Sequence, residues 1–250
     1  MLIMTREKVI EVKNLVKKFG SFIANDNLSF DVYKGEIFGF LGANGAGKTT
    51  AMKILCGLSK PTNGDIKIVG YDVYRDTEKI KNSIGYMSQK FSLYDDLTVW
   101  ENFRFFGGIY GLSRNEIQSQ TEHLLNRLGI WDYKDRIISS IPLGWKQKLA
   151  FSVAIMHRPA IVFLDEPTGG VDPVTRRQFW DLIYQAAADG FTVFVTTHYM
   201  DEAEYCDRVS IMVDGRIRAL DTPENLKMTF DCQDMQEVFI KLAREAKYVD

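Results

Sequence analysis

The chain has 250 residues, of which 46% are hydrophobic and 26% charged, and its formal net charge is −2. This composition is typical of a globular protein with a sizeable core, and it excludes a disordered or fibrous chain. The small net charge disfavours binding of nucleic acid through a generally basic surface, and no apolar run approaches the ~20 residues that cross a bilayer.

The first part of the chain alternates β-type runs with helical patterns. Strands are expected over residues 9–13, 27–33, 36–41, 65–69 and 84–87. Helical patterns cover residues 48–58 and 75–82. Pro61 and the pair Asn63 and Gly64 separate the first helical pattern from the strand that follows it.

The second part of the chain predicts more helix. An apolar period of about 3.6 indicates helices between residues 97 and 128, and Pro159 follows a further helix over residues 145–157. Buried strands are expected at residues 161–164, 191–196 and 209–213, with a helix at 173–188. Asp214 and Gly215 predict a tight hairpin. Such alternation predicts an α/β fold whose sheet is covered on both faces, with a helical insert at about residues 90–158.

A glycine-rich segment between a strand and a helix fits the pattern GxxxxGK[ST] of a phosphate-binding loop. It consists of Gly42, Ala43, Asn44, Gly45, Ala46, Gly47, Lys48 and Thr49. Glycines allow backbone N–H groups to surround phosphates at the start of a helix. Lys48 is expected to neutralise β- and γ-phosphate oxygens and the Thr49 hydroxyl to ligate Mg²⁺. The alternative is a glycine-rich turn without a ligand.

Polar residues also follow three other expected strands. Asp165 and Glu166 end one strand, Gln89 follows a second and His198 a third. Open α/β sheets bind ligands at the carboxyl ends of their strands, so these side chains are expected near the phosphate loop. Asp165 could hold Mg²⁺ through water, Glu166 could act as base for an attacking water, His198 could reach the γ-phosphate, and Gln89 could touch both metal and water. The alternative is that these groups only cap or solvate strand ends.

Together these segments resemble the ATP-binding subunit of ABC transporters over essentially the whole chain. The matching segments are GANGAGKTT at residues 42–50, Gln89, IVFLDEPTGGVDP at 161–173 and TTHYMDEAE at 196–204. The first segment adds Thr50 to the expected nucleotide-binding residues. The resemblance implies a P-loop NTPase fold with a RecA-like core sheet, an N-terminal antiparallel β subdomain and a helical subdomain at about 90–158. One such domain would cover residues 1–250.

The resemblance also implies a role for each matching residue. Phe19 would stack on adenine, which needs only a π face, although it could instead be a core aromatic. The catalytic residues would be Glu166, His198 and Gln89, and the Mg²⁺ ligands Thr49, Gln89 and Asp165. Asp172 would lie in the loop that communicates across a dimer of nucleotide-binding subunits.

One motif departs from the family pattern. The signature LSGGQ aligns with IPLGW at residues 141–145, so that Pro142 replaces the serine, Leu143 replaces the first glycine, and Gly144 alone is retained for nucleotide binding. A similar LPLGWKQ run is known from some bacterial multidrug-type exporter ATPases, and the end of the chain is also similar to that branch. The departure leaves open how well one subunit completes its partner's ATP site.

The function implied is an ATP-binding and ATP-hydrolysing subunit that powers an ABC-type membrane exporter, with ATP and Mg²⁺ as cofactors. Its partners would be integral-membrane permease subunits and a second ATPase subunit, identical or paralogous, and not nucleic acid. Three distant cysteines outside any CxxC pair fit a reducing, cytoplasmic location, here peripheral on the inner face of the membrane.

A run of aromatic and leucine side chains would receive the permease, or would instead form the core of the helical insert. Its members are Phe91, Leu93, Tyr94, Trp100, Phe103, Phe105, Phe106 and Tyr110. The alternative function is a soluble ABC-type ATPase acting on ribosomes, DNA or Fe–S assembly. It is disfavoured because neither a second ATPase domain nor a long coiled coil is seen, and a kinase is disfavoured because no acceptor motif is seen.

Overall fold

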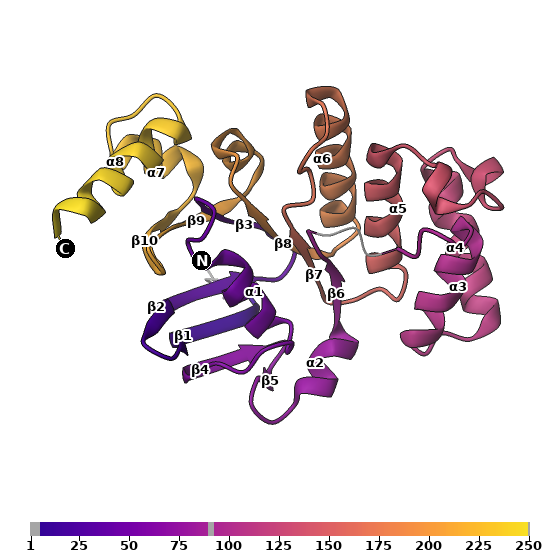
Figure 1. Ribbon diagram of the computed structural model, residues 1–250, viewed down its shortest axis with the longest axis horizontal. Coiled ribbons are helices and arrows are strands. Elements are labelled where there is room, and N and C mark those ends of the chain that lie inside the picture. The colour runs from indigo at the N-terminus through magenta and orange to yellow at the C-terminus, as the bar shows by residue number, and fades with distance from the viewer. Residues whose placement is uncertain (1–5, 90–92, 250) are drawn as a thin grey trace, which may run out of the picture.

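The computed structural model describes residues 6–89 and 93–249, and its centre is a six-stranded sheet in the order β10-β9-β3-β8-β7-β6 (Figure 1). The strands are β3 (Ile37–Gly42), β6 (Ile84–Met87), β7 (Ile161–Asp165), β8 (Thr192–Thr197), β9 (Arg208–Val213) and β10 (Arg216–Asp221). The five from β9 to β6 in this order pair in parallel, and β10 pairs antiparallel with β9. Every residue of β3, β7 and β8 is buried, as expected of strands covered on both faces.

An antiparallel sheet in the order β2-β1-β4-β5 lies on one face of the central sheet. Its strands are β1 (Lys8–Phe19), β2 (Phe22–Tyr33), β4 (Asn63–Ile68) and β5 (Tyr71–Asp72), and helix α1 (Lys48–Leu55) shares the core between the sheets. Phenylalanine rings fill the space between the two layers. Phe30 of β2 lies 5.7 Å from Phe38 of β3, and within the central sheet Phe194 lies 5.3 Å from both Phe40 and Phe163, measured between centroids. These buried rings stabilise the face that carries α1.

Most of the helices pack in a second core on the opposite face. The α-helices after α1 are α2 (Thr77–Ser83), α3 (Val99–Ile109), α4 (Arg114–Arg127), α5 (Leu143–Ile155), α6 (Pro173–Ala188), α7 (Pro223–Thr229) and α8 (Met235–Val249). Short 3-10 helices are η1 (Trp131–Tyr133), η2 (Ile138–Ser140) and η3 (Met200–Tyr205). The segment from α3 to α5 enters the chain between the neighbouring strands β6 and β7 and forms one end of the molecule (Figure 1).

The predicted α/β fold class is confirmed, including the antiparallel sheet formed by the N-terminal part of the chain. Several boundaries differ from the prediction. The helix expected over 48–58 ends at Leu55, two residues before Gly57 in a left-handed conformation (φ +67°). The helices expected between residues 97 and 128 are α3 and α4, separated near Gly111, whereas α5 both begins and ends two residues earlier than expected. Among the described helices, none combines the length and apolarity needed to cross a membrane.

Candidate functional site

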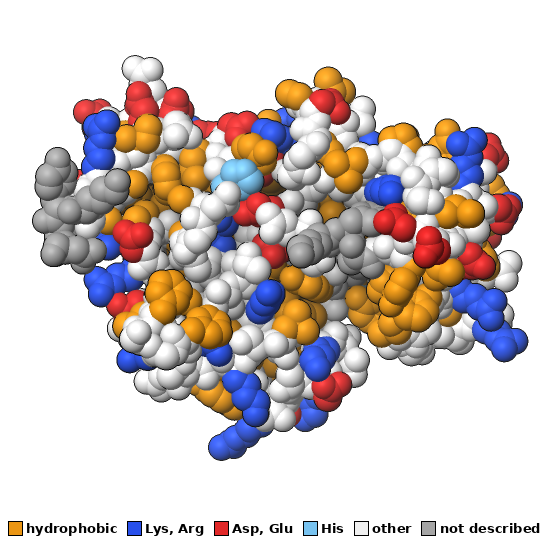
Figure 2. All heavy atoms as spheres, in the orientation of Figure 1, with side chains coloured by type: hydrophobic (Ala, Val, Ile, Leu, Met, Phe, Trp, Pro, Cys, Tyr) orange, Lys and Arg blue, Asp and Glu red, His pale blue; other side chains and the backbone are white. Residues whose placement is uncertain are grey.

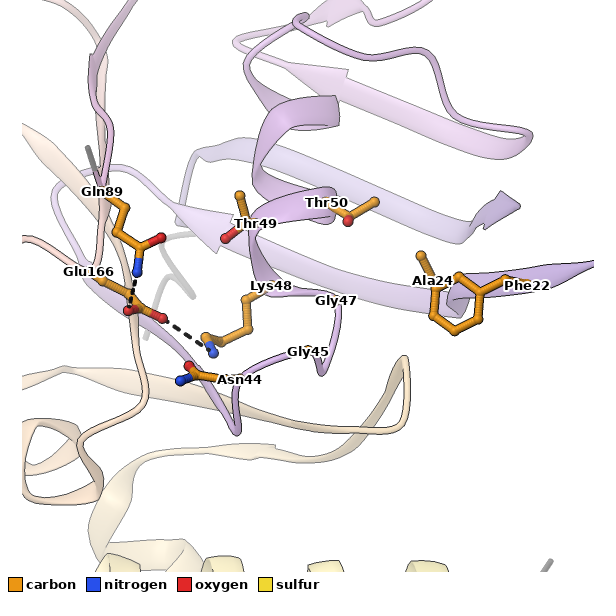
Figure 3. Close-up of a pocket in the computed structure, with 10 residues that line it drawn as sticks. All are labelled: Phe22, Ala24, Asn44, Gly45, Gly47, Lys48, Thr49, Thr50, Gln89 and Glu166. Atoms are coloured by element: carbon orange, nitrogen blue, oxygen red, sulfur yellow. Dashed lines mark hydrogen bonds and ion pairs between the residues drawn. The ribbon is translucent and has the colours of Figure 1, made fainter. Parts of the chain in front are cut away.

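A cavity of about 270 Å³ opens where the carboxyl ends of β3, β8, β7 and β6 meet (Figure 3). Its lining residues are Phe22, Ala24, Asn44, Gly45, Gly47, Lys48, Thr49, Thr50, Gln89 and Glu166. They come from the hairpin of β1 and β2, the loop after β3, the start of α1 and the ends of β6 and β7. The structure therefore brings the phosphate loop together with two of the polar strand ends that the sequence predicted.

The shape of the loop depends on Gly47, which precedes α1 and has φ +99°. A Cβ atom here would lie 2.3 Å from the backbone oxygen of Ala24, so no other residue fits without a shift of β2. The buried Asn25 side chain donates from Nδ2 to the Gly47 carbonyl at 3.1 Å. Strand β2 thus holds the loop so that the first N–H groups of α1 point into the cavity, where they favour an anion.

Lys48 is the cation of the cavity. Its Nζ donates to the carbonyl oxygens of Gly42 at 2.8 Å and Ala43 at 3.0 Å, and lies 3.6 Å from Oε1 of Glu166 (Figure 3). Only 4% of the residue is exposed, and burial lowers the pKa of its ammonium, against the nearby carboxylates that raise it. A buried ammonium with weak carbonyl partners is well placed to exchange them for phosphate oxygens.

Asp165 ends strand β7 and faces the start of α1. Its Oδ1 accepts from the hydroxyl of Thr196 at 2.6 Å and from that of Thr49 at 3.3 Å. Burial raises the pKa of this carboxyl, and the charge of Glu166 adds to the rise, while the two hydroxyls oppose it. The Thr49 hydroxyl and the Asp165 carboxylate therefore lie next to each other beside the phosphate loop, and both can supply oxygen ligands to a cation.

Glu166 lies where the other predicted residues converge. Its backbone has φ +49°, and its N–H donates to the carbonyl of Thr196 at 3.1 Å, so the chain turns sharply after β7. Gln89 donates from Nε2 to Oε2 of Glu166 at 2.8 Å, and Nδ1 of His198 lies 3.1 Å from the same oxygen. The side chain is 9% exposed and held by three neighbours, counting Lys48. Such a carboxylate can be positioned as a base for a water at the end of a phosphate chain.

The aromatic residue that lines the cavity is Phe22, not Phe19. The two are directly paired across the turn between β1 and β2, so their rings leave the same face of the ribbon. Phe19 is 55% exposed, with Nζ of Lys17 lying 4.9 Å from its ring centroid, and Phe22 is 63% exposed. Sequence reasoning missed Phe22, because the pairing that puts it beside the phosphate loop depends on the length of the turn.

The sequence family described as ABC transporter matches residues 25–169, more than half of the chain. The chain belongs to this family. Among curated relatives of this ABC protein, it is 46% identical over 244 residues to a probable multidrug ABC transporter ATP-binding protein, YbhF, of Escherichia coli. It is also 35% identical over 219 residues to the linearmycin resistance ATP-binding protein LnrL of Bacillus subtilis. The family predicted from the sequence motifs is thereby confirmed.

These alignments cover different shares of the relatives. They include 96% of this chain and 42% of the E. coli protein, and 87% of this chain and 70% of the B. subtilis protein. A solved structure of an ATP-binding subunit of an ABC transporter aligns with a TM-score of 0.84 at 29% identity, covering 94% of this chain and 99% of that one. The fold is thus that of an ABC ATPase domain.

The residues aligned with the ABC signature line a separate cavity of about 390 Å³ at the starts of α5 and α6. Its lining residues are Pro142, Leu143, Gly144, Trp145, Lys148, Gly170, Val171, Asp172, Thr175 and Gln178. The structure brings Gly144 and Asp172 together here, and not at the phosphate loop of the same chain. This second cavity is called the α5/α6 cavity below.

Two contacts explain how the α5/α6 cavity is built. A Cβ atom on Gly144 would lie 2.4 Å from Cγ2 of Thr175, so glycine allows the two helices to start close together. Asp172 caps α6 by accepting from the N–H groups of Val174 and Thr175 at 2.9 and 3.0 Å. Leu143, at 47% exposure, also lines a small cavity of about 80 Å³ that contains Gln89 and Glu166. Leu143, which replaces a signature glycine, therefore lines the α5/α6 cavity and also lies close to Gln89 and Glu166 of the phosphate-loop cavity.

Proposed function

We propose that this chain binds MgATP at the phosphate loop, hydrolyses it, and powers an ABC-type membrane exporter. The observation that carries the proposal is the position of Glu166, which contacts Gln89, His198 and Lys48 beside a phosphate loop. Each contact comes from the end of a different strand or from α1, so a single small region holds a base, a cation and two orienting groups. Such convergence is what a phosphoryl-transfer site requires.

In the proposed reaction, the loop N–H groups and Lys48 hold the β- and γ-phosphates of ATP. Glu166 accepts a proton from a water that attacks the γ-phosphorus, and the bond from that phosphorus to the β–γ bridging oxygen breaks, giving ADP and inorganic phosphate. His198 and Gln89, both in contact with one oxygen of Glu166, orient the carboxylate and the water. Phe22 stacks on the adenine ring of ATP at the other end of the cavity.

The residues around Asp165 fit a magnesium ion. In the part of the chain that the structure describes, no three acidic, histidine or cysteine side chains cluster as metal ligands. Mg²⁺, however, uses few protein ligands and takes the remaining oxygens from phosphates and water. Thr49, Asp165 and Gln89 would supply the protein oxygens, and the ion would neutralise charge on the phosphates.

The partners in this proposal are a second ATPase subunit, identical or paralogous, and integral-membrane permease subunits. The α5/α6 cavity would face the ATP of the second subunit, because Gly144 and Asp172 lie there and away from the chain's own phosphate loop. Each dimer would then enclose two ATP molecules. The chain would work at the cytoplasmic face of the membrane.

An apolar surface near α3 is the proposed contact with the permease. Figure 2 shows hydrophobic side chains gathered at the end of the molecule that carries α3. Tyr94, Phe105 and Ile109 are 51%, 42% and 60% exposed, and the ring centroids of Tyr94 and Phe105 lie 4.9 Å apart. Phe103 is fully buried and belongs to the helical core, and Phe91 lies outside the described residues. Buried Asn102 fixes the turn that presents Tyr94, because its side chain bonds to both the N–H and the carbonyl of that residue.

The first test measures phosphate release by the purified chain with MgATP, with and without EDTA. We expect turnover that EDTA abolishes; binding of ATP without any turnover, alone or with its permease, would contradict the proposal.

The second test co-expresses the chain with a membrane permease encoded beside it and separates membranes from the soluble fraction. The chain should follow the permease into membranes, and Phe105→Asp should weaken this association. Met228→Asp, at an exposed apolar residue on α7, is the control. Sedimentation with ribosomes or DNA regardless of the permease would favour the soluble alternative.

A further inference from the structure

A charged cluster of Thr168, Arg176 and Glu202 joins α6 to the segment that carries His198, and none of these three residues lines the phosphate cavity. Glu202, in η3, is completely buried, and its Oε1 accepts from the hydroxyl of Thr168 at 2.5 Å. Nε of Arg176, in the first turns of α6, lies 3.7 Å from the same oxygen. A fully buried carboxylate is tolerated only when a cation and hydrogen bonds compensate its charge. Arg176 is that cation.

Arg176 also holds the residue next to His198. Its guanidinium carbon lies 4.0 Å from the ring centroid of Tyr199, within the range of a cation–π contact. Tyr199 in turn lies against the imidazole of His198, with ring centroids 4.2 Å apart. Asp201 adds a weaker, exposed contact at 3.5 Å. One side chain of α6 therefore restrains His198 through Tyr199 and, through Glu202, the helix that follows.

The same arginine is tied to the α5/α6 cavity. Its backbone N–H donates to the carbonyl of Asp172, and Thr175, the preceding residue, lines that cavity. Thr168, on the other side of the cluster, lies two residues after Glu166 and is 1% exposed. The start of α6, the Glu166 turn and the His198 segment thus share one set of buried contacts.

We infer that Arg176 is a positioning residue that keeps His198 against Glu166 and makes this contact depend on the start of α6. The inference rests on the proposed hydrolysis at Glu166 and adds a means of regulation. A partner that engages the α5/α6 cavity shifts α6, and Arg176 transmits the shift to His198. Arginine suits this role because its planar group can lie flat on Tyr199 while it faces Glu202, which lysine cannot reproduce.

The test replaces Arg176 with Met, which keeps most of the stem and removes the charge. We expect kcat for MgATP to fall about tenfold with KM within about twofold, because Arg176 lies outside the nucleotide cavity while a small displacement of an orienting group slows chemistry. Arg177→Met is the matched control, since Arg177 is the exposed neighbour that contacts Asp181 and Tyr205 and should leave kcat unchanged. Equal kcat values for the two variants would overturn the inference.

Loss of Arg176 also leaves Glu202 as an uncompensated buried charge, so the variant is expected to melt roughly 10 °C lower. The double variant Arg176→Met with Glu202→Gln removes that charge and should regain most of the Tm while kcat stays low. Recovery of kcat together with Tm would mean that Arg176 only stabilises the fold. Arg176→Lys should restore Tm better than it restores kcat.

Action through His198 is tested by combining Arg176→Met with His198→Ala. The double variant should turn over at the rate of His198→Ala alone, whereas multiplied losses would overturn the inference. A readout independent of hydrolysis is the NMR signal of the His198 ring, which can be assigned with His198→Ala because the chain has three histidines. Arg176→Met should shift this signal in the absence of nucleotide and Arg177→Met should not. If the parent chain did not hydrolyse ATP, the proposed function would fail while this measurement still decided the position of His198.

Discussion

The phosphate-loop cavity and the α5/α6 cavity are built from different kinds of contact. At the phosphate loop, charged groups are paired within the chain: Lys48 with carbonyls and Glu166, and Asp165 with two threonine hydroxyls. At the α5/α6 cavity, the lining residue Leu143 exposes 47% of its surface. The first region is arranged before any ligand arrives. The second combines paired polar groups with the exposed apolar side chain of Leu143.

This difference indicates that the two regions have different roles in the proposed reaction. The proposed binding and cleavage of ATP would depend on atoms that the folded chain already places close together. In the proposed dimer, closure over the γ-phosphate of the partner's ATP would depend on a segment in which Pro142 and Leu143 stand where the family has serine and glycine. The expected effects of substitutions therefore decrease from the charged residues at the phosphate loop to the α5/α6 cavity, and are smallest at the aromatic ring that also lines the first cavity; four sets of variants test this order.

The largest effect is expected for Lys48→Ala, which should reduce ATP hydrolysis to the buffer background. The variant removes the buried cation of the cavity and leaves Glu166 facing the phosphates with less compensating charge. Phosphate release measures the loss, and circular dichroism should show that the fold is retained. Lys53→Ala, an exposed lysine of the same helix, is the control and should hydrolyse ATP like the parent. Parent-like activity of Lys48→Ala would show that the site is misassigned.

Glu166→Gln is expected to bind MgATP and hydrolyse it ~10²–10⁴-fold more slowly, because the amide keeps the shape of the carboxylate but is not a base. In the proposed dimer, ATP would then remain trapped between two subunits. Size-exclusion chromatography with and without ATP measures this, and Glu122→Gln on the exposed face of α4 serves as control. A variant that stays monomeric at high concentration with ATP bound would contradict the proposed dimer.

The double change Pro142→Ser with Leu143→Gly is expected to raise turnover of the isolated chain by one to two decades. It restores a hydroxyl donor, worth ~1.5–3 kcal/mol when it bonds to a charged group, and removes a side chain that hinders close approach of phosphate. Steady-state turnover without permease is the measurement. Because Leu143 also lines the small cavity next to Gln89, Pro142→Ser alone is the companion variant. An unchanged or lower rate would mean that this variant signature positions the γ-phosphate in another way.

The smallest effect is expected at the aromatic contact with adenine. Phe22→Ala should raise the KM for ATP roughly tenfold through the loss of one stacking contact, with kcat little changed. Phe19→Ala should raise it less, because Phe19 does not line the cavity, and Phe22→Tyr should leave it unchanged. If Phe19→Ala raised the KM more than Phe22→Ala, the contact with adenine would be assigned to Phe19, the residue that the family resemblance favoured.

The sequence predicted elements well where periodicity and end signals agree. The strand at 84–87 and the helix at 173–188, with its Asp172 cap and proline at the first turn, have the predicted bounds. Strand β1 is longer than predicted by six residues at its end, because register shifts at Val12 and Leu15 interrupt the alternation that reveals a strand. Helices α7 and α8 were not predicted.

At the site, the same distinction holds. The phosphate loop and the strand-end residues are recognisable because their chemistry requires particular residue types at particular positions. Phe22 and Arg176 are not, since stacking and positioning depend only on which side chains become neighbours. The contact of Arg176 with Tyr199 joins residues 23 positions apart, and sequence pattern contains no signal for it.

Strand β2 supports both ends of the nucleotide cavity. Ala24 and Asn25 fix Gly47 of the phosphate loop, and Phe22 lies three residues before Asn25 on the same strand. Three residues of strand span about 10 Å, a length set by backbone geometry that does not adjust to a ligand. The spacing between a ring that can carry a base and a loop that can carry phosphates is therefore fixed in the single subunit. A single subunit would therefore select nucleotides by the distance between base and phosphates before it meets a partner. Variants that cannot dimerise should keep this selectivity.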